Sequence, residues 1–308
     1  MAPRPRRNST RQQPSGSGRQ RSAPRAVSKR SDAPRTGRPG STARTRAPQT
    51  NRPRSSAPRG LGGTQVEGRH AVRELLLAGN RRVSEIFMSN ELDQADIIDD
   101  IVELASDLKI PIREASRKAI DAMSFTEASQ GVVAHAKELP EAEFEDLCGH
   151  TSPFLIAVDG ITDPHNLGAI LRTAECVGVT GMVLPRHRTV HITPTVTKTS
   201  AGAIEHVPMS LVGGLPSAIE AMKKADIWVL GLDAAADHDV HHMKLRNSGV
   251  CLVVGAEGKG LSRLVRQRCD ALVSLPMRGQ LGSLNAATAA SVAMYEVLRS
   301  RDAANQAS

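Results

Sequence analysis

The sequence is poor in aromatic residues and in long apolar runs. Its 308 residues include four Phe, one Tyr and one Trp, too few to indicate a surface on which the bases of single-stranded RNA would stack. No run approaches the roughly 18 apolar residues that a membrane-spanning helix needs, so we expect no membrane contact. No apolar segment follows the basic amino terminus either, and a secretory signal is therefore not expected.

Neither the cysteines nor the histidines form a metal-binding pattern. The stretch D-H-D-V-H-H at residues 237–242 matches no recognised zinc motif, and metal ligands usually come from more than one rigid element. We therefore expect no metal. The cysteines are widely spaced, form no C-x-x-C pair and fit reduced thiols in the cytosol; they are Cys148, Cys176, Cys251 and Cys269.

The first 60 residues differ in composition from the rest. They contain nine of the eighteen prolines, no Leu, Ile, Phe, Tyr, Trp or Cys, and Val27 as the single branched aliphatic residue. Such a segment cannot offset its ordering entropy by burial, so we predict a disordered arm. It carries 16 Lys and Arg against Asp32, a charge of +15, which leaves 24 minus 31, or −7, for the remainder. An arm of this kind binds polyanions such as RNA or the ribosome, or serves as a solubilising tail.

Apolar periodicity predicts two folded units joined by a linker at 139–151. The first, residues 63–138, alternates helical and extended patterns and is expected to be a small α/β domain. Its predicted elements are helices at 68–79, 97–108 and 116–123, and extended segments at 83–88, 110–113 and 131–136.

The second unit, residues 152–301, alternates apolar strands with helices, a pattern typical of a mostly parallel sheet covered on both faces. Ligands of such sheets usually bind at the carboxyl ends of the strands. Strands are predicted at 154–158, 182–184, 207–211, 227–232, 250–254 and 272–275, and helices near 167–177, 195–201, 215–224, 261–268 and 285–299.

Three segments that follow predicted strands carry polar residues suited to a site. In the first, 159–175, Asn166 would cap or precede the first turn of a helix. Arg172 lies off the buried stripe of that helix. Taken alone, this segment favours reading Arg172 as a surface charge that is solvated or paired with Glu175, because such pairs are common on helices.

The second segment, 255–260, places three glycines in six residues, which lets backbone approach a ligand closely. Its order, G-x-x-G-x-G, matches neither the dinucleotide fingerprint nor the phosphate loop, so a nicotinamide or ATP enzyme is disfavoured. A tight turn into a helix remains an alternative interpretation.

The third segment, 275–293, ends in a helix with an unusually small face. Its alanines at helical spacing permit close packing against a sheet or a partner. Ser283 and Asn285 precede this helix, and capping would by itself account for either.

Three segments together resemble the signature motifs of the SpoU branch of the SPOUT RNA methyltransferases. They read N-L-G-A-I-L-R-T-A-E, V-G-A-E-G-K-G-L and L-P-M-R-G-Q-L-G-S-L-N-A-A-T-A. The resemblance spans about residues 154–299. The unit that begins V-E-G-R-H-A-V is similar to the small substrate-binding domain of the bacterial 23S ribosomal RNA guanosine-2'-O-methyltransferases. The resemblance of the larger unit implies a catalytic domain tied in a trefoil knot, a rare exception to unknotted topology.

The resemblance also implies a cofactor, a site and a homodimer with the site near the subunit interface. The cofactor would be S-adenosylmethionine, with no metal. By position in the motifs, Gly255, Leu275 and Leu284 would line its pocket. The catalytic and ribose-binding positions would be Asn166, Arg172, Glu257, Ser283 and Asn285.

The implied reaction is attack of a ribose 2'-hydroxyl on the methyl group of a sulfonium, which requires positioning of both reactants and management of one proton. Arg172 would activate the hydroxyl as a general base, or bind the neighbouring phosphate and stabilise the developing alkoxide. We expect a cytoplasmic enzyme acting on 23S ribosomal RNA at a guanosine, with the basic arm on RNA or the ribosome. The alternatives are a tRNA ribose methyltransferase of the same branch and a non-catalytic RNA-binding or ribosome-assembly factor.

Overall fold

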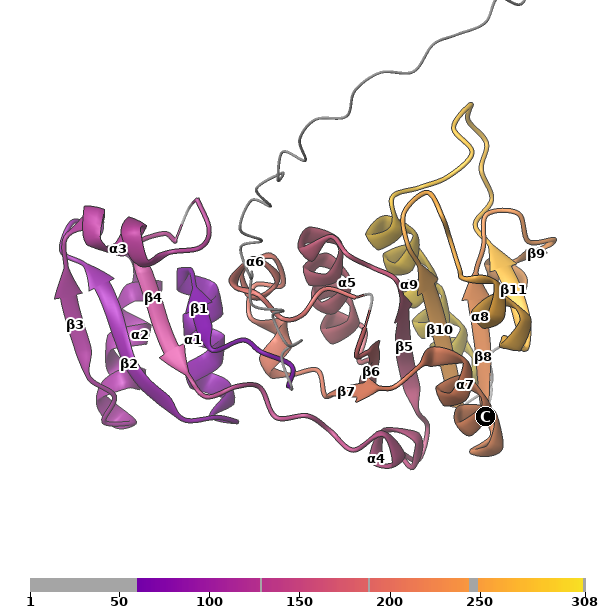
Figure 1. Ribbon diagram of the computed structural model, residues 1–308, viewed down its shortest axis with the longest axis horizontal. Coiled ribbons are helices and arrows are strands. Elements are labelled where there is room, and N and C mark those ends of the chain that lie inside the picture. Colours follow the sequence, from indigo (N-terminus) through magenta and orange to yellow (C-terminus); the bar gives the residue numbers. More distant parts are fainter. Residues whose placement is uncertain (1–59, 128, 188, 244–248, 307–308) are drawn as a thin grey trace, which may run out of the picture. The chain divides into compact units, whose positions relative to one another are not determined.

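The computed structural model describes residues 60–127, 129–187, 189–243 and 249–306 (Figure 1). The arm predicted to be disordered, residues 1–60, falls almost entirely outside these ranges. The described residues form two sheets, one of four strands and one of seven. The predicted α/β class, with a small amino-terminal domain before a larger, mostly parallel sheet, is therefore confirmed.

The small domain has strand order β1-β4-β2-β3, in which β2 and β3 are parallel and the other pairs antiparallel. Helix α1 buries Val72 and Leu75 on one face, and it ends at Gly79, whose positive φ of 59° suits glycine. Strand β1 has only three residues, too short for an alternating pattern to reveal it. The elements are β1 (Gln65–Glu67), α1 (Arg69–Ala78), β2 (Val83–Ser89), α2 (Asp96–Asp107), β3 (Ile112–Ala115), α3 (Arg117–Met123) and β4 (Val132–Ala136).

The larger sheet has strand order β7-β6-β5-β10-β8-β11-β9, and all of its pairings are parallel. Its strands are β5 (Phe154–Asp159), β6 (Gly181–Pro185), β7 (Met209–Val212), β8 (Ile227–Leu232), β9 (His238–Asp239), β10 (Gly249–Gly255) and β11 (Ala271–Ser274). Sequence patterns predicted all of these strands except β9, which has two polar residues and lies at the sheet edge.

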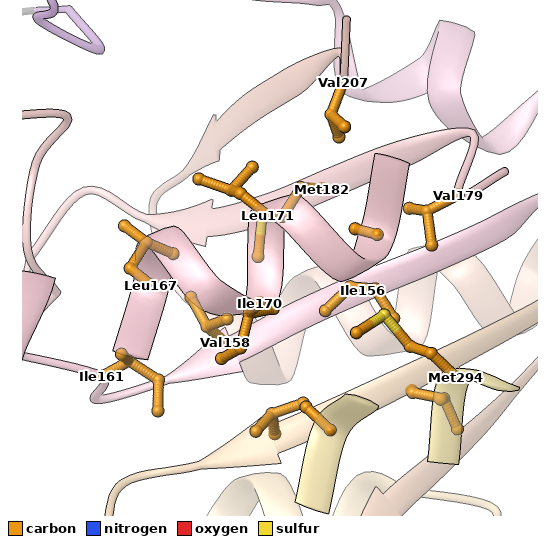
Figure 2. Close-up of a cluster of buried hydrophobic side chains, with 14 of the residues drawn as sticks. Ile156, Val158, Ile161, Leu167, Ile170, Leu171, Val179, Met182, Val207 and Met294 are labelled. Carbon is orange, nitrogen blue, oxygen red and sulfur yellow. The ribbon is translucent and has the colours of Figure 1, made fainter. Parts of the chain in front are cut away.

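Helices cover both faces of this sheet because successive strand residues point to opposite sides. On β5, Ile156 and Val158 pack with α5 and α9, whereas Leu155 and Ala157 pack with α7 and α8. Figure 2 shows the first of these clusters, with Met294 of α9 lying close to Ile156. The helices are α5 (Pro164–Cys176), α6 (Pro194–Thr199), α7 (Leu215–Lys224), α8 (Arg263–Arg268) and α9 (Ala286–Gln306), with 3-10 turns η1 (Ala203–Glu205) and η2 (Val240–His242).

The stretch predicted to be a linker, 139–151, contains the short helix α4 (Phe144–Cys148). Leu147 of this helix is buried against Gly181. A Cβ atom at Gly181 would lie 2.6 Å from Leu147 Cδ2, so glycine there makes room for the contact. The connection is therefore partly packed on the larger sheet, a contact between distant segments that local patterns do not encode.

A buried ion pair joins the small domain to the larger one. The Arg81 guanidinium donates to both carboxylate oxygens of Glu205, at 3.0 and 2.6 Å, and also to the carbonyls of Gly63 and Lys137. Both side chains are almost fully buried. Leu61, which precedes the small domain in the chain, belongs to the core of the larger one. The chain thus contacts the larger domain on both sides of the small one.

The four cysteines are free thiols. Burial raises the pKa of Cys148 and of Cys269 to about 11, and raises the pKa of Cys251 well above its usual value. Raised pKa values of this kind are typical of thiols with a structural role, whereas Cys176 is exposed. Among the described residues, no helix is both long enough and apolar enough to cross a membrane.

Candidate active site

The candidate site lies where β5 and β10 end, side by side in the parallel sheet. Asp159 closes β5, and its Oδ2 accepts a hydrogen bond of 2.6 Å from the backbone N–H of Ser262. This bond fixes the chain that returns from β10. The carboxyl edge of the sheet, where ligands of parallel sheets bind, is therefore built from both segments.

The glycine-rich segment forms a tight turn at this edge. Ala256 and Gly260 exchange two backbone hydrogen bonds, at 3.1 and 2.8 Å. A Cβ atom at Gly255 would lie 2.3 Å from the carbonyl carbon of Gly260, and Gly258 and Gly260 have φ of 74° and 63°. The interpretation as a tight turn is thus correct, but α8 begins at Arg263 and not at Leu261, because the turn occupies the intervening residues.

A cavity of about 320 Å³ opens beside this turn, within the size range of pockets for small organic ligands. Backbone of the glycine turn forms one wall and the chain between β11 and α9 forms another. Residues from the second and third motifs line the cavity, among them Gly255, Glu257, Leu261, Leu275, Ser283 and Leu284. The structure thus brings together all three positions expected to line the cofactor pocket.

Three polar side chains from the three motifs meet in a hydrogen-bonded chain. Asn166 Nδ2 donates to Glu257 Oε2 at 3.3 Å, and Asn285 Nδ2 donates to Asn166 Oδ1 at 2.9 Å. Asn166 is buried, whereas Glu257 and Asn285 are exposed. The chain ends in a carboxylate that accepts hydrogen bonds when ionised, so the cluster can orient a hydroxyl group at the mouth of the cavity.

Helix caps explain part of this arrangement. Asp163 caps α5 by accepting a hydrogen bond from the His165 N–H. Asn166 therefore lies inside the first turn, and the expectation that it caps or precedes this turn is wrong. Asn285 does cap α9, since its Oδ1 accepts from the N–H groups of Ala287 and Thr288. Its amide therefore serves both the helix and Asn166.

Arg172 lies away from the polar cluster, on the exposed side of α5. It lies six positions after Asn166, which at about 100° per residue places the two side chains roughly 120° apart around the helix. Within the described part of the chain, Arg172 forms no ion pair or hydrogen bond, and the pair with Glu175 is not present. Its guanidinium is therefore open to a ligand that reaches α5 from outside.

The histidines of residues 237–242 form a different contact. His241 Nδ1 lies 3.0 Å from Glu296 Oε2, and Arg299 also donates to this carboxylate. Hydrogen bonds from Arg299 and His241 hold the pKa of Glu296 below its usual range. No group of three or more His, Cys, Asp or Glu side chains positioned to bind a metal occurs among the described residues.

Two residues at the site were not singled out in the sequence. Asp159 anchors the glycine turn, and Asp233 lines the cavity and pairs with Arg266 at 2.7 Å. Asp159 is the last residue of β5, and Asp233 directly follows β8. The rule that polar residues at the carboxyl ends of parallel strands form sites would have found both.

Two family models match the chain, consecutively. Residues 65–142 match the RNA 2'-O ribose methyltransferase substrate binding domain, and residues 153–295 match the SpoU rRNA Methylase family. A Bacillus subtilis protein, YacO, named for the TrmH family of tRNA/rRNA methyltransferases, is 42% identical over 242 residues, which are 77% of this chain and 96% of the relative. The 23S rRNA (guanosine-2'-O-)-methyltransferase RlmB of Photobacterium profundum is 36% identical over 238 residues, covering 76% and 96% of the two chains.

Solved structures of similar proteins share the fold of this chain. The SpoU methyltransferase AviRb of Streptomyces viridochromogenes, in complex with the cofactor AdoMet (S-adenosylmethionine), superposes with a TM-score of 0.65 at 25% identity, covering 78% of this chain and 90% of AviRb. Fold and matches together define an S-adenosylmethionine-dependent RNA 2'-O-ribose methyltransferase. The chain belongs to the SpoU rRNA methylase family.

Proposed function

We propose that this enzyme methylates the 2'-hydroxyl of a guanosine in 23S ribosomal RNA. The observation that carries the proposal is the hydrogen-bonded chain of Asn166, Glu257 and Asn285 beside the glycine-walled cavity. The choice of RNA is supported by the 36% identity with RlmB of Photobacterium profundum, whose length is almost fully matched. We place the reaction in the cytoplasm, where ribosomal RNA is available.

We propose that S-adenosylmethionine occupies the cavity. The residues fit it, because glycine at position 255 permits the tight turn whose backbone forms one wall of the cavity, while Leu275 and Leu284 supply apolar walls. When bound, the cofactor supplies an electrophilic methyl group on a sulfonium. The backbone of residues 255–260 and the two leucines then hold the cofactor and exclude water from it.

Asn166, Glu257, Ser283 and Asn285 are assigned to the ribose. Glu257 accepts a hydrogen bond from a ribose hydroxyl, and its own position is set by Asn166. Ser283 lines the same cavity and donates or accepts through its hydroxyl. Together these groups hold the 2'-oxygen in line with the methyl group, which converts a bimolecular encounter into a positioned one.

Arg172 is assigned to the phosphate beside the reacting ribose. A guanidinium keeps its proton in proteins, so Arg172 stabilises the developing alkoxide by charge, and the hydroxyl proton passes to solvent. Its exposed position, without an ion pair in the described ranges, leaves the charge available to RNA. This role is electrostatic, of the kind that usually contributes most to catalysis.

A homodimer would bring Arg172 and the cavity to the same substrate. Support comes from the separation of Arg172 from Asn166 around α5, and from large apolar side chains exposed near the cavity and on α9. These are Met277, Leu281, Leu284, Val292 and Tyr295. Exposed large apolar side chains are typical of interaction surfaces where they form a patch.

The trefoil knot is proposed from the chain path. Strand β10 lies between β5 and β8, and α9, which follows β11, packs beside α5, where Thr173 Oγ1 lies 2.9 Å from Ser291 Oγ. This path is consistent with passage of the carboxyl-terminal segment through a loop of the earlier chain. The cavity lies between the glycine turn and the segment that leads to α9, which is where we propose that the chain crosses.

The basic arm, residues 1–60, is proposed to strengthen RNA binding by counterion release. For every phosphate that the arm neutralises, its deletion should reduce the slope of log affinity against log salt by about 0.9. A deletion of these residues that leaves the salt dependence of RNA binding unchanged would remove this role.

The function is tested by incubating the full chain with labelled S-adenosylmethionine and, separately, with 23S ribosomal RNA, 16S ribosomal RNA and total tRNA. We expect label in 23S RNA, and mass spectrometry of nuclease fragments should locate it on the ribose of one guanosine. Label confined to tRNA would favour the second candidate function, a tRNA ribose methyltransferase, which the tRNA/rRNA name of the Bacillus subtilis relative supports. Failure to bind the cofactor in calorimetry would leave a non-catalytic RNA-binding factor.

A further inference from the structure

A single buried carboxylate holds the loop between α3 and β4. Glu67, at the end of β1, is fully buried and has no cation beside it in the described residues. Its two oxygens accept hydrogen bonds from Gln65 Nε2 at 2.8 Å, Phe125 N at 2.7 Å, and Thr126 N and Oγ1 at 3.0 and 2.5 Å. Four donors converge on this one side chain, two of them the backbone N–H groups of residues 125 and 126, so the backbone there is held in place.

The fixed loop presents an aromatic ring to solvent. Phe125 is 75% exposed, more than Tyr295 at 53% or Trp228 at 36%. A single exposed apolar side chain is common in proteins and needs no explanation. What distinguishes Phe125 is that its backbone N–H donates to a buried carboxyl group, whereas its ring belongs to none of the core clusters among the described residues.

Positive side chains lie at the other end of the same loop. Arg69 donates from its backbone N and from Nε to Gln130, at 3.0 and 3.2 Å. Lys198 of α6 is adjacent, since its Cγ lies 3.8 Å from the position of a Cβ at Gly68. Neither cation forms an ion pair within the residues that the structure covers, so both charges are available to a polyanion.

These residues connect to the candidate active site through α6. Thr199, next to Lys198, lies 3.4 Å from His165 Nδ1 through its Oγ1, and His165 directly precedes Asn166 on α5. The loop of Phe125, the two cations and the polar cluster are therefore linked by consecutive contacts. A chain of nucleotides whose ribose lies at Asn166 has a positively charged route toward the small domain.

We propose that Phe125, Arg69 and Lys198 form a recognition surface for an unpaired nucleotide of the RNA substrate, with its base stacked on the Phe125 ring and neighbouring phosphates on the two cations. The proposal rests on the proposed function and names the part of the substrate that the small domain reads. An unpaired nucleotide is specified because stacking on a side chain requires a base that is splayed out of its helix. The small number of aromatic residues gave no reason to expect such a surface, yet one exposed ring on the loop whose other end Arg69 contacts is enough to stack one base.

The test compares binding of 23S ribosomal RNA, and methyl transfer to it, in full-length variants at position 125. Phe125→Ala should weaken RNA binding and raise KM for RNA about tenfold to a hundredfold, the loss expected for one stacked base. Values of kcat and the calorimetric Kd for S-adenosylmethionine should stay unchanged. Phe125→Trp should restore binding and Phe125→Leu should not, because leucine is apolar but has no ring to stack.

One control and one further variant of the recognition surface accompany these substitutions. Val102→Ala removes another exposed apolar side chain of the small domain and should bind RNA like the wild type. Lys198→Gln should reduce the slope of log affinity against log salt by about one, as expected when one phosphate is no longer neutralised.

Equal RNA binding by Phe125→Ala and wild type would overturn the recognition surface, and so would full RNA binding by Phe125→Leu, which would show that no ring is needed at this position. Neither result affects the proposed function, because the binding measurement needs no methyl transfer. Conversely, wild-type protein that binds 23S RNA through Phe125 but transfers no methyl group would contradict the proposed function and leave the surface standing.

Discussion

Asn285 and Asn166 lie 119 residues apart in the sequence and share a hydrogen bond of 2.9 Å. The same Asn285 side chain caps α9 through its other atom, Oδ1. One amide thus couples the start of the last helix to the polar cluster at the cavity. Capping and site formation are therefore not competing explanations for this residue, and a substitution can separate them.

Replacing Asn285 with Asp should keep the cap and break the site. Aspartate is as good a cap as asparagine, but it has no N–H to donate to Asn166 Oδ1. We expect the stability of Asn285→Asp to lie within about 0.5 kcal/mol of wild type and its methyl transfer to be abolished. Asn285→Ala should lose transfer and also about 0.5–2 kcal/mol of stability. Denaturant unfolding and transfer assays measure both, and an active Asn285→Asp would show that the bond to Asn166 is dispensable.

Removal of the Arg172 charge should reduce methyl transfer by about 100-fold or more. Cofactor binding should be nearly unchanged, because Arg172 does not line the cavity. Single-turnover transfer and calorimetry on Arg172→Ala measure the two effects. Glu175→Gln, an exposed neighbour on the same helix, is the control and should remain active. Normal turnover in Arg172→Ala would remove its assigned role.

A methyl group at Gly255 should displace the glycine turn. The added Cβ would lie 2.3 Å from a backbone carbon and 2.5 Å from Leu261 N, neither of which can rotate away. We expect Gly255→Ala to lose about 1–3 kcal/mol of stability and to bind S-adenosylmethionine more weakly in calorimetry. Gly282→Ala is the matched control, since a Cβ there meets nothing within 4 Å. Equal cofactor affinity in both variants would contradict the assignment of the cavity.

Breaking the buried Arg81–Glu205 pair should strongly destabilise the protein. Arg81→Met leaves an unpaired buried carboxylate, at a cost of about 3–5 kcal/mol. The double variant Arg81→Met with Glu205→Met should cost less than this single one, because no charge stays buried. Arg117→Met removes an exposed pair with Asp121 and should cost about 0.5 kcal/mol or less. Urea unfolding of the four proteins tests this, and a cost for Arg81→Met no greater than that of the control would contradict it.

Acid should remove a contribution of Glu296 to stability. Its pKa in the folded protein is lowered, first by the hydrogen bond from Arg299 and then by His241. A lowered carboxyl pKa stabilises the folded state above the pKa of the unfolded chain, and this contribution is lost as pH falls through the folded value. Glu296→Gln should therefore be less stable than wild type at pH 7, with the difference shrinking below about pH 4.

Urea unfolding of both proteins across this pH range provides the measurement. Glu103→Gln, at an exposed position of α2, should show a much smaller difference at pH 7. A difference for Glu296→Gln that stays constant down to acid pH would assign its effect to packing and not to charge.

Much of the fold could be predicted because its signals are local. Buried parallel strands such as β5 and β10 are short, continuous apolar runs, and the stripe of α5 follows helical spacing, so each element is encoded where it forms. The edge strands β1 and β9 were missed because two or three residues are too few to show a period. The packed helix α4 was missed because Leu147 needs the room left by Gly181, 34 residues along the chain.

The sequence by itself determined most of the elements, their order and the three motifs, since propensity and periodicity act over a few neighbouring residues. Only the tertiary structure decided that Asn166, Glu257 and Asn285 share hydrogen bonds while Arg172 lies apart from them, because those contacts join segments about 90 to 120 residues distant and depend on how strands are ordered in the sheet. The exposure of Phe125 was decided in the same way, by a buried carboxylate 58 residues earlier in the chain that no local pattern connects to it.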